Sequence, residues 1–379
     1  MNYLILTSFG QVMSYIGYIA LAILILLVMI TVHEFGHYIA GKIFKFGIDE
    51  FAIGFGPKIF SRKKKNGELF SVRALPIGGF CAFRGEDDDS EDPTAFNNKK
   101  WWQRIIVLIS GALMNYLLAL VLLLIMCFSY GVPMCITVPT GYKGEKLTPA
   151  AWETPTVQAL DILVSIEGRE IDMYTDCMDA LAGKKAGDSV SVIVYRLYEE
   201  TVDGNTVRSW REKEVSLTLL ADGDFSSSAD MEKLEKAIGL SIATQSVKRD
   251  FWHTVGGAFE YSGEMATSVL RTLGELITGA FGDKTADVVS GPISMIGQTA
   301  QVASMSPFSF LYIASFIGVN LAVFNLLPVP ALDGCKVIFC IIEWIRKKPI
   351  NRKIEGIINF VGLALLFGFV ILIDLLKLF

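Results

Sequence analysis

A long uncharged run that ends in two histidines constrains this chain more than any other feature. Residues 14–32 carry no charge and are almost entirely apolar, as expected of a membrane-spanning helix. His33, Glu34 and His37 follow directly, while the apolar pattern continues beyond them. Ionisable residues inside a bilayer are costly and usually serve a function. The run has no basic N-terminal region and no small-residue cleavage site, so we interpret it as a span and not as a signal peptide.

The spacing of these residues predicts a metal site. On a helix, His33 and His37 lie one turn apart, so both imidazoles project from one face and can share a zinc ion. Glu34 is placed to take a proton from a water that the metal activates. A catalytic zinc usually takes a third protein ligand. His253 lies in a segment expected outside the cytoplasm, so Asp333 is the best candidate for that ligand.

Four apolar runs reach the roughly 20 residues that a bilayer crossing needs: about 14–36, 105–128, 308–331 and 355–375. The chain of 379 residues is 52% hydrophobic, which also favours a membrane protein. Lysine and arginine concentrate after the first run and after the third, so the positive-inside rule makes both of those segments cytoplasmic. His33, His37 and Asp333 then lie near the cytoplasmic side and can meet. The sequence has no basic stripe, which argues against nucleic-acid binding.

The segments between these runs are predicted to hold two further structures. Residues 48–84 favour strands and turns, either as a hairpin that dips into the membrane or as a hairpin on the cytoplasmic surface. Residues 140–222 predict an α+β module outside the cytoplasm. Residues 251–282 predict an amphipathic helix. A fifth span there is the alternative, but it would place Asp333 on the opposite side from the histidines.

Polar and proline residues near the predicted site suggest where a substrate is held. Pro328 and Pro330 break the third span, and their free backbone groups could pair with an extended peptide. Asn325 is a polar group in an apolar run and could hydrogen-bond substrate or join two helices. Asn115 lies among small residues that suggest close helix packing, and the same two roles remain open for it. The six cysteines form no metal or disulfide pattern.

Over most of its length, the chain resembles the site-2 proteases, the intramembrane zinc metalloproteases, in their bacterial branch with an extracytoplasmic PDZ domain. His33 to His37 matches the family's HExxH, and Asn325 to Gly334 matches its NxxPxPxLDG segment. Residues 51–57 and 76–80 are similar to its membrane re-entrant β-region. Ser290 to Ile293 is similar to the stretch before its third span. Thr148 to Ala151 and Asp161 to Gly168 resemble parts of its PDZ module, which either binds a ligand or excludes bulky substrates.

The resemblance implies one Zn²⁺ per chain and proteolysis of single-pass membrane proteins already shortened by another protease, such as anti-sigma factors and remnant signal peptides. It implies that His33, His37 and Asp333 bind zinc, that Glu34 is the base, and that Asn325 helps to hold the substrate strand. A metal transporter and a non-catalytic PDZ scaffold are the alternatives. We assign substrate contacts to seven residues: Asn325, Pro328, Pro330, Gly334, Asn115, Gly78 and Gly79.

We therefore expect an α-helical polytopic protein of the bacterial cytoplasmic membrane, with both termini and an inserted α+β PDZ-like domain outside the cytoplasm. Its expected parts are a first transmembrane helix (1–47), a membrane-associated β-region and loop (48–104), a second transmembrane helix (105–130), the PDZ-like domain (131–222), a linker with amphipathic surface helices (223–305), a third transmembrane helix (306–335), a cytoplasmic loop (336–354) and a fourth transmembrane helix (355–379).

Overall fold

The computed structural model describes residues 9–86, 90–141, 151–202, 205–225, 230–278 and 306–376, together with the single positions 227, 297, 299, 301 and 302. Ser290 to Ile293 and most of the segment from Thr148 to Ala151 lie outside the described residues. The chain divides into two compact units, which we describe separately. One unit comprises Met1–Leu123 and Val289–Phe379, and the other comprises Leu124–Val288.

The first unit is built on long helices. They are α1 (Phe9–Ile43), α2 (Trp101–Tyr130), α8 (Pro307–Asn325), α9 (Asp333–Arg346) and α10 (Arg352–Leu376). Among the described residues, three are long and apolar enough to cross a membrane: Ile19–Ile43 of α1, the whole of α2, and α8. This agrees with a polytopic membrane protein, while crossing by α10 remains a prediction.

The predicted third span is divided where its prolines fall. Helix α8 ends at Asn325, and a new helix, α9, begins at Asp333. Pro328 and Pro330 explain the break, because proline cannot donate a backbone hydrogen bond and clashes with the preceding helical turn. The span that was expected to reach residue 335 therefore ends ten residues earlier, and Asp333 opens the next helix.

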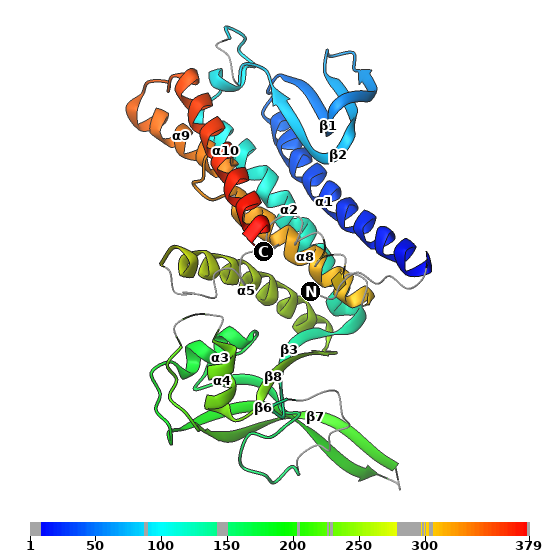
Figure 1. Cartoon of the computed structure of the whole chain (residues 1–379), viewed down its shortest axis with the longest axis vertical. Coiled ribbons are helices and arrows are strands. Elements are labelled where there is room, and N and C mark those ends of the chain that lie inside the picture. The colour runs from blue at the N-terminus through cyan, green and yellow to red at the C-terminus, as the bar shows by residue number, and fades with distance from the viewer. Residues whose placement is uncertain are drawn as a thin grey trace. The chain divides into compact units, whose positions relative to one another are not determined.

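A bent two-stranded sheet lies beside α1 (Figure 1). Strands β1 (Ile48–Lys63) and β2 (Leu69–Phe83) form it, as the turn-rich sequence predicts. Both strands fold back on themselves, so that Phe51 pairs with Cys81 on one side and with Phe70 on the other. Gly54 and Gly78 allow the bends, since both have φ near +90° to +100° and a side chain at Gly78 would strike the ring of Phe55. The last part of β2 consequently forms an edge of the sheet next to α1.

The second unit contains a sheet of strand order β7-β6-β4-β3-β8, with β5 paired to β4. Its strands are β3 (Val132–Val138), β4 (Ile162–Ile166), β5 (Arg169–Glu170), β6 (Ser189–Val202), β7 (Asn205–Thr218) and β8 (Ser241–Val247). Helix α3 (Tyr174–Leu181) and helix α4 (Met231–Ile238) pack on its apolar core. This agrees with the predicted α+β module.

The predicted end of that module at residue 222 was wrong. Helix α4 and strand β8 both fall in the segment expected to be a linker, and β8 pairs with β3 from Val132↔Val247 to Val138↔Ser241. A strand whose partner lies about one hundred residues away leaves no local signal of its pairing. Helix α5 (Phe251–Thr278) follows and is not among the helices that could cross a membrane, which agrees with the amphipathic interpretation.

Candidate active site

Three of the predicted site residues converge in the first unit. The Nε2 atom of His33 lies 3.0 Å from Oδ2 of Asp333, and the Nε2 atom of His37 lies 3.2 Å from the same oxygen. The two Nε2 atoms are 3.1 Å apart. Zinc bound tetrahedrally at about 2.0–2.1 Å separates its ligand atoms by roughly 3.3 Å. The three side chains therefore fit one zinc ion, and among the described residues they form the one group of His, Cys, Asp and Glu with this spacing.

The backbone explains why these side chains meet. His33 and His37 occupy successive turns of α1, with their rings 4.7 Å apart and almost perpendicular. Asp333 is the first residue of α9, where the positive end of the helix dipole favours a carboxylate. Gly334 lets this helix start so close to the preceding chain, because a Cβ there would lie 2.3 Å from the carbonyl oxygen of Leu327. This close packing explains why a glycine is needed at position 334, and the sequence alone did not reveal it.

Helix α2 supplies contacts that sequence reasoning missed. A Cβ at Gly111 would lie 2.5 Å from Nε2 of His37 and 2.7 Å from Cε1 of His33, so only glycine fits against both rings. A Cβ at Gly36 would lie 2.3 Å from the carbonyl oxygen of Ser110, which shows how closely α1 and α2 approach. The run of small residues around Gly111 was the sequence signal for this contact. It indicated close helix packing in general, and not packing against the two histidines.

The orientation of His37 is fixed by a backbone group. Its Nδ1 atom lies 2.8 Å from the carbonyl oxygen of Val107, which can only accept a hydrogen bond. The proton of His37 therefore sits on Nδ1, and the lone pair of Nε2 points to the other two ligand atoms. Metal-binding histidines commonly use their second nitrogen in this way. A backbone carbonyl has no side chain to mark it, so no sequence pattern could have identified Val107.

Glu34 lies between two cavities. One, of about 280 Å³, is lined by Glu34, His37 and Asp333 together with β2 residues from Phe80 to Phe83. The other, of about 250 Å³, is lined by His33, Glu34 and Asp333 with Asn325 and Leu332. Glu34 thus borders both cavities, while His33 and His37 are buried. Both cavities are lined by Glu34 together with Asp333.

The structure places the predicted substrate residues in different surroundings. Gly79 lies beside Glu34, since a Cβ there would be 3.6 Å from Cγ of that side chain. Asn325 lines the cavity of 250 Å³. Pro328 is exposed, and Pro330 packs against Gly362 of α10, where a Cβ would lie only 2.2 Å from it. Asn115 is fully buried in α2 and lies 3.4 Å from His33.

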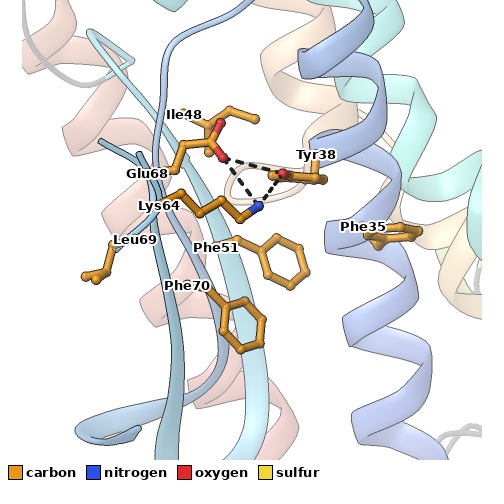
Figure 2. Close-up of a pocket in the computed structure, with 8 residues that line it drawn as sticks. All are labelled: Phe35, Tyr38, Ile48, Phe51, Lys64, Glu68, Leu69 and Phe70. Carbon is orange, nitrogen blue, oxygen red and sulfur yellow. Dashed lines mark hydrogen bonds and ion pairs between the residues drawn. The ribbon is translucent and has the colours of Figure 1, made fainter. Parts of the chain in front are cut away.

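A cluster of polar and aromatic side chains joins the sheet to α1 (Figure 2). Lys64 donates to the hydroxyl of Tyr38 at 2.8 Å and pairs with Glu68 at 3.5 Å, while Glu68 also pairs with Lys42. A cavity of about 150 Å³ lies beneath them, between Phe35, Phe51 and Phe70. Tyr38 and Lys42 are one and two turns after Glu34 on α1, so this cluster fixes the sheet close to the site. We call Tyr38, Lys42, Lys64 and Glu68 the hairpin clasp.

Comparisons with known proteins identify the family of the chain. The model of peptidase family M50 matches residues 21–369. A Clostridium perfringens protein that carries the provisional name of a zinc metalloprotease is 32% identical over 362 residues, which cover 94% of this chain and 97% of that protein. The zinc metalloprotease RasP of Bacillus licheniformis is 28% identical over 91% of this chain and 94% of its own. The regulator of sigma-W protease RasP of Bacillus subtilis is 26% identical over 89% and 92%.

The helices, the ligand set and these relatives together define a membrane-embedded zinc metalloprotease. The chain belongs to peptidase family M50, the site-2 proteases, because the family model covers most of its length.

Proposed function

We propose that this protein hydrolyses a peptide bond within the transmembrane segment of single-pass membrane proteins that another protease has already shortened. Anti-sigma factors and remnant signal peptides are the proposed substrates. The observation that carries the proposal is the convergence of His33, His37 and Asp333 beside Glu34 on helices apolar enough to cross a membrane. The name of the Bacillus subtilis relative, a regulator of sigma-W protease, supports the link to sigma-factor control.

In this proposal the residues divide the chemistry between them. Zinc held by His33, His37 and Asp333 would polarise the scissile carbonyl and lower the pKa of a water. Glu34 accepts a proton from the attacking water and then delivers it to the leaving amine. Its position between two cavities gives it access to both the water and the amine.

Substrate binding is proposed to use an extended peptide, because the hydrogen bonds of a helix shield its peptide groups. The edge formed by the last part of β2, with Gly78 and Gly79, would pair with that peptide by β-augmentation. Asn325 would hydrogen-bond the peptide backbone on the other side of Glu34. Pro328 and Pro330 in the following loop, and Gly334 in the first turn of α9, are the other proposed contacts there. The absence of a side chain at Gly79 leaves room for a strand beside Glu34.

The proposed location is the bacterial cytoplasmic membrane, with α10 as a fourth crossing and both termini outside the cytoplasm. Arginine and lysine after α1 and around α9 support this orientation through the positive-inside rule. We propose that the second unit is an extracytoplasmic PDZ-like domain. Its antiparallel sheet and two short helices on one core are consistent with that assignment. There it would either bind a peptide or exclude substrates with bulky outer domains.

The test is cleavage of a model transmembrane peptide by the full chain in detergent, wild type beside Glu34→Gln, with zinc measured in both. We expect Glu34→Gln to retain its zinc and to lose about 10²- to 10⁴-fold in rate, the usual contribution of a general base. Zinc in both proteins with cleavage by neither would overturn the proposed reaction. Metal transport or a non-catalytic scaffold role would then remain as the alternative functions of the protein.

A further inference from the structure

The Nδ1 proton of His33 lacks the clear hydrogen-bond acceptor that the Nδ1 proton of His37 has. The Nε2 atom of His33 faces the other two ligand atoms, so a metal bond there leaves the proton of the neutral ring on Nδ1. His33 is buried, and a buried N–H group needs an acceptor. For His37 that acceptor is the carbonyl of Val107. For His33, the groups nearest to Nδ1 are the side-chain amides of Asn115 and Asn325, each with Nδ2 at 3.4 Å.

Both amides thus present a donor to a ring nitrogen that must itself donate. One of them has to turn by 180°, which exchanges its nitrogen and oxygen without changing its shape. Nδ1 carries one hydrogen, so it needs the oxygen of only one amide.

The burial of the two amides decides which one turns. Asn115 is 0% exposed, and its Oδ1 atom is buried without a hydrogen-bond partner. Such an orphaned acceptor costs roughly 1–3 kcal/mol. Turning this amide places Oδ1 where Nδ2 now lies, 3.4 Å from Nδ1 of His33, and gives it a donor. Asn325 is only half-buried and lines a cavity, so its amide remains available to a peptide.

We propose that Asn115 is a positioning residue of the zinc site, whose side-chain oxygen accepts the Nδ1 proton of His33. The bond holds the imidazole in the tautomer and orientation that present Nε2 to the metal. Asn115 then does for His33 what the Val107 carbonyl does for His37, and it leaves substrate contact to Asn325. This inference rests on His33 as a zinc ligand, the role given to it in the proposed function.

The test measures zinc release from the full chain in detergent into an excess of chelator. Asn115→Leu keeps the volume but removes the acceptor, whereas Asn115→Asp offers only acceptors. We expect Asn115→Leu to lower zinc affinity about 10- to 100-fold, as loss of such partners does, and Asn115→Asp to release zinc at the wild-type rate or more slowly. Asn320→Leu is the matched control, because Asn320 bonds only to the carbonyl of Phe316 in its own helix among the described contacts. Asn325→Leu should slow peptide cleavage with zinc release unchanged.

Wild-type zinc retention in Asn115→Leu would overturn the proposal, and so would equally fast release from Asn115→Asp and Asn115→Leu, which would indicate packing between helices. If Asn115→Leu does not fold, Asn115→Asp still decides, because release faster than wild type contradicts an acceptor role. The absorption of bound Co²⁺ provides a second readout, since it should change in Asn115→Leu and not in Asn320→Leu. Wild-type protein that holds zinc but cleaves no membrane peptide would contradict the proposed function and leave this test intact.

Discussion

Two buried polar clusters, one in each unit, differ in whether their groups satisfy one another. In the second unit, Arg196 and Asp161 are each 1% exposed, and the guanidinium donates to both carboxylate oxygens at 2.8 and 2.6 Å. Its Nη1 and Nη2 atoms also donate to the carbonyl oxygens of Thr154 and Thr156. In the first unit, two imidazole nitrogens and a carboxylate oxygen face one another within 3.2 Å. A single proton can bridge one pair of those three atoms, whereas a cation satisfies all of them.

The difference indicates that buried polar groups stabilise the fold in the second unit, whereas those in the first unit are arranged to bind a cation. A cluster with matched donors and acceptors needs nothing more and can only hold strands together. A cluster made of acceptors needs a ligand, and it is useful only where cavities let other molecules approach, as they do beside Glu34. The following predictions test this contrast, beginning with the largest expected effect.

Asp333→Asn should remove zinc and activity together. The substitution keeps the size of the side chain but replaces a carboxylate, the donor proposed as the third zinc ligand, by a neutral amide that binds zinc much more weakly. We expect zinc per chain to fall far below one and peptide cleavage to fall to the rate of the peptide alone, measured by elemental analysis and by product formation. Asp161→Asn is the matched control and should keep its zinc. Full zinc occupancy in Asp333→Asn would mean that the third ligand is another group.

Arg196→Met should unfold the second unit without changing the zinc content of the protein. It leaves the Asp161 carboxylate buried without a partner, which costs about 3–5 kcal/mol. Amide hydrogen exchange in β4 and β6 should accelerate strongly, while zinc content stays at the wild-type value. Arg211→Met is the control on a neighbouring strand, because its pair with Glu200 is half-exposed and worth about 1 kcal/mol at most. Unchanged exchange in Arg196→Met would show that the buried pair contributes little to stability.

Gly111→Ala should weaken zinc binding through a single added methyl group. That methyl would lie within 2.7 Å of both ligand rings, and overpacking of this kind typically costs about 1–3 kcal/mol. We expect zinc to be released into a chelator about 10- to 100-fold faster. Gly17→Ala in α1 is the control, since no atom lies within 4 Å of its added Cβ. Equal zinc release from both variants would mean that α2 can move away from the rings at little cost.

The parts of the site that could be predicted from the sequence are those that depend on side-chain type and spacing. His33, Glu34 and His37 share one helix, and the prolines before Asp333 mark a break that carries a charged group. The parts that could not be predicted depend on how distant backbones meet. The Val107 carbonyl, the fit of Gly111 and the pairing of β8 with β3 all arise between segments separated by many residues.

The same reasoning explains the errors in the predicted boundaries. The α+β module was expected to end at 222, just after the last strand predicted for it, Val215 to Leu220. Its last helix and strand are short and half-exposed, so local pattern alone could not separate them from a linker. The third span was given too long a range because an apolar run continues through residues 326–332, although the chain there is no longer helical.

Lys64→Met should give the smallest effect, because the side chain of Lys64 is half-exposed and Glu68 has a second partner in the hairpin clasp. The lysine donates to Tyr38 at 2.8 Å, and loss of such a hydrogen bond costs about 0.5–1.5 kcal/mol. Glu68 keeps its ion pair with Lys42, so its charge is not left alone. Amide exchange in β1 and β2 should accelerate by about 2- to 10-fold, with zinc content unchanged. Lys65→Met, one residue further and exposed, should leave exchange as in wild type. If Lys64→Met instead reduced zinc binding as strongly as Gly111→Ala, the sheet would be part of the metal site and not only attached beside it. The hairpin clasp would then belong with the zinc cluster in the comparison above, and not with the purely structural pair of Arg196 and Asp161.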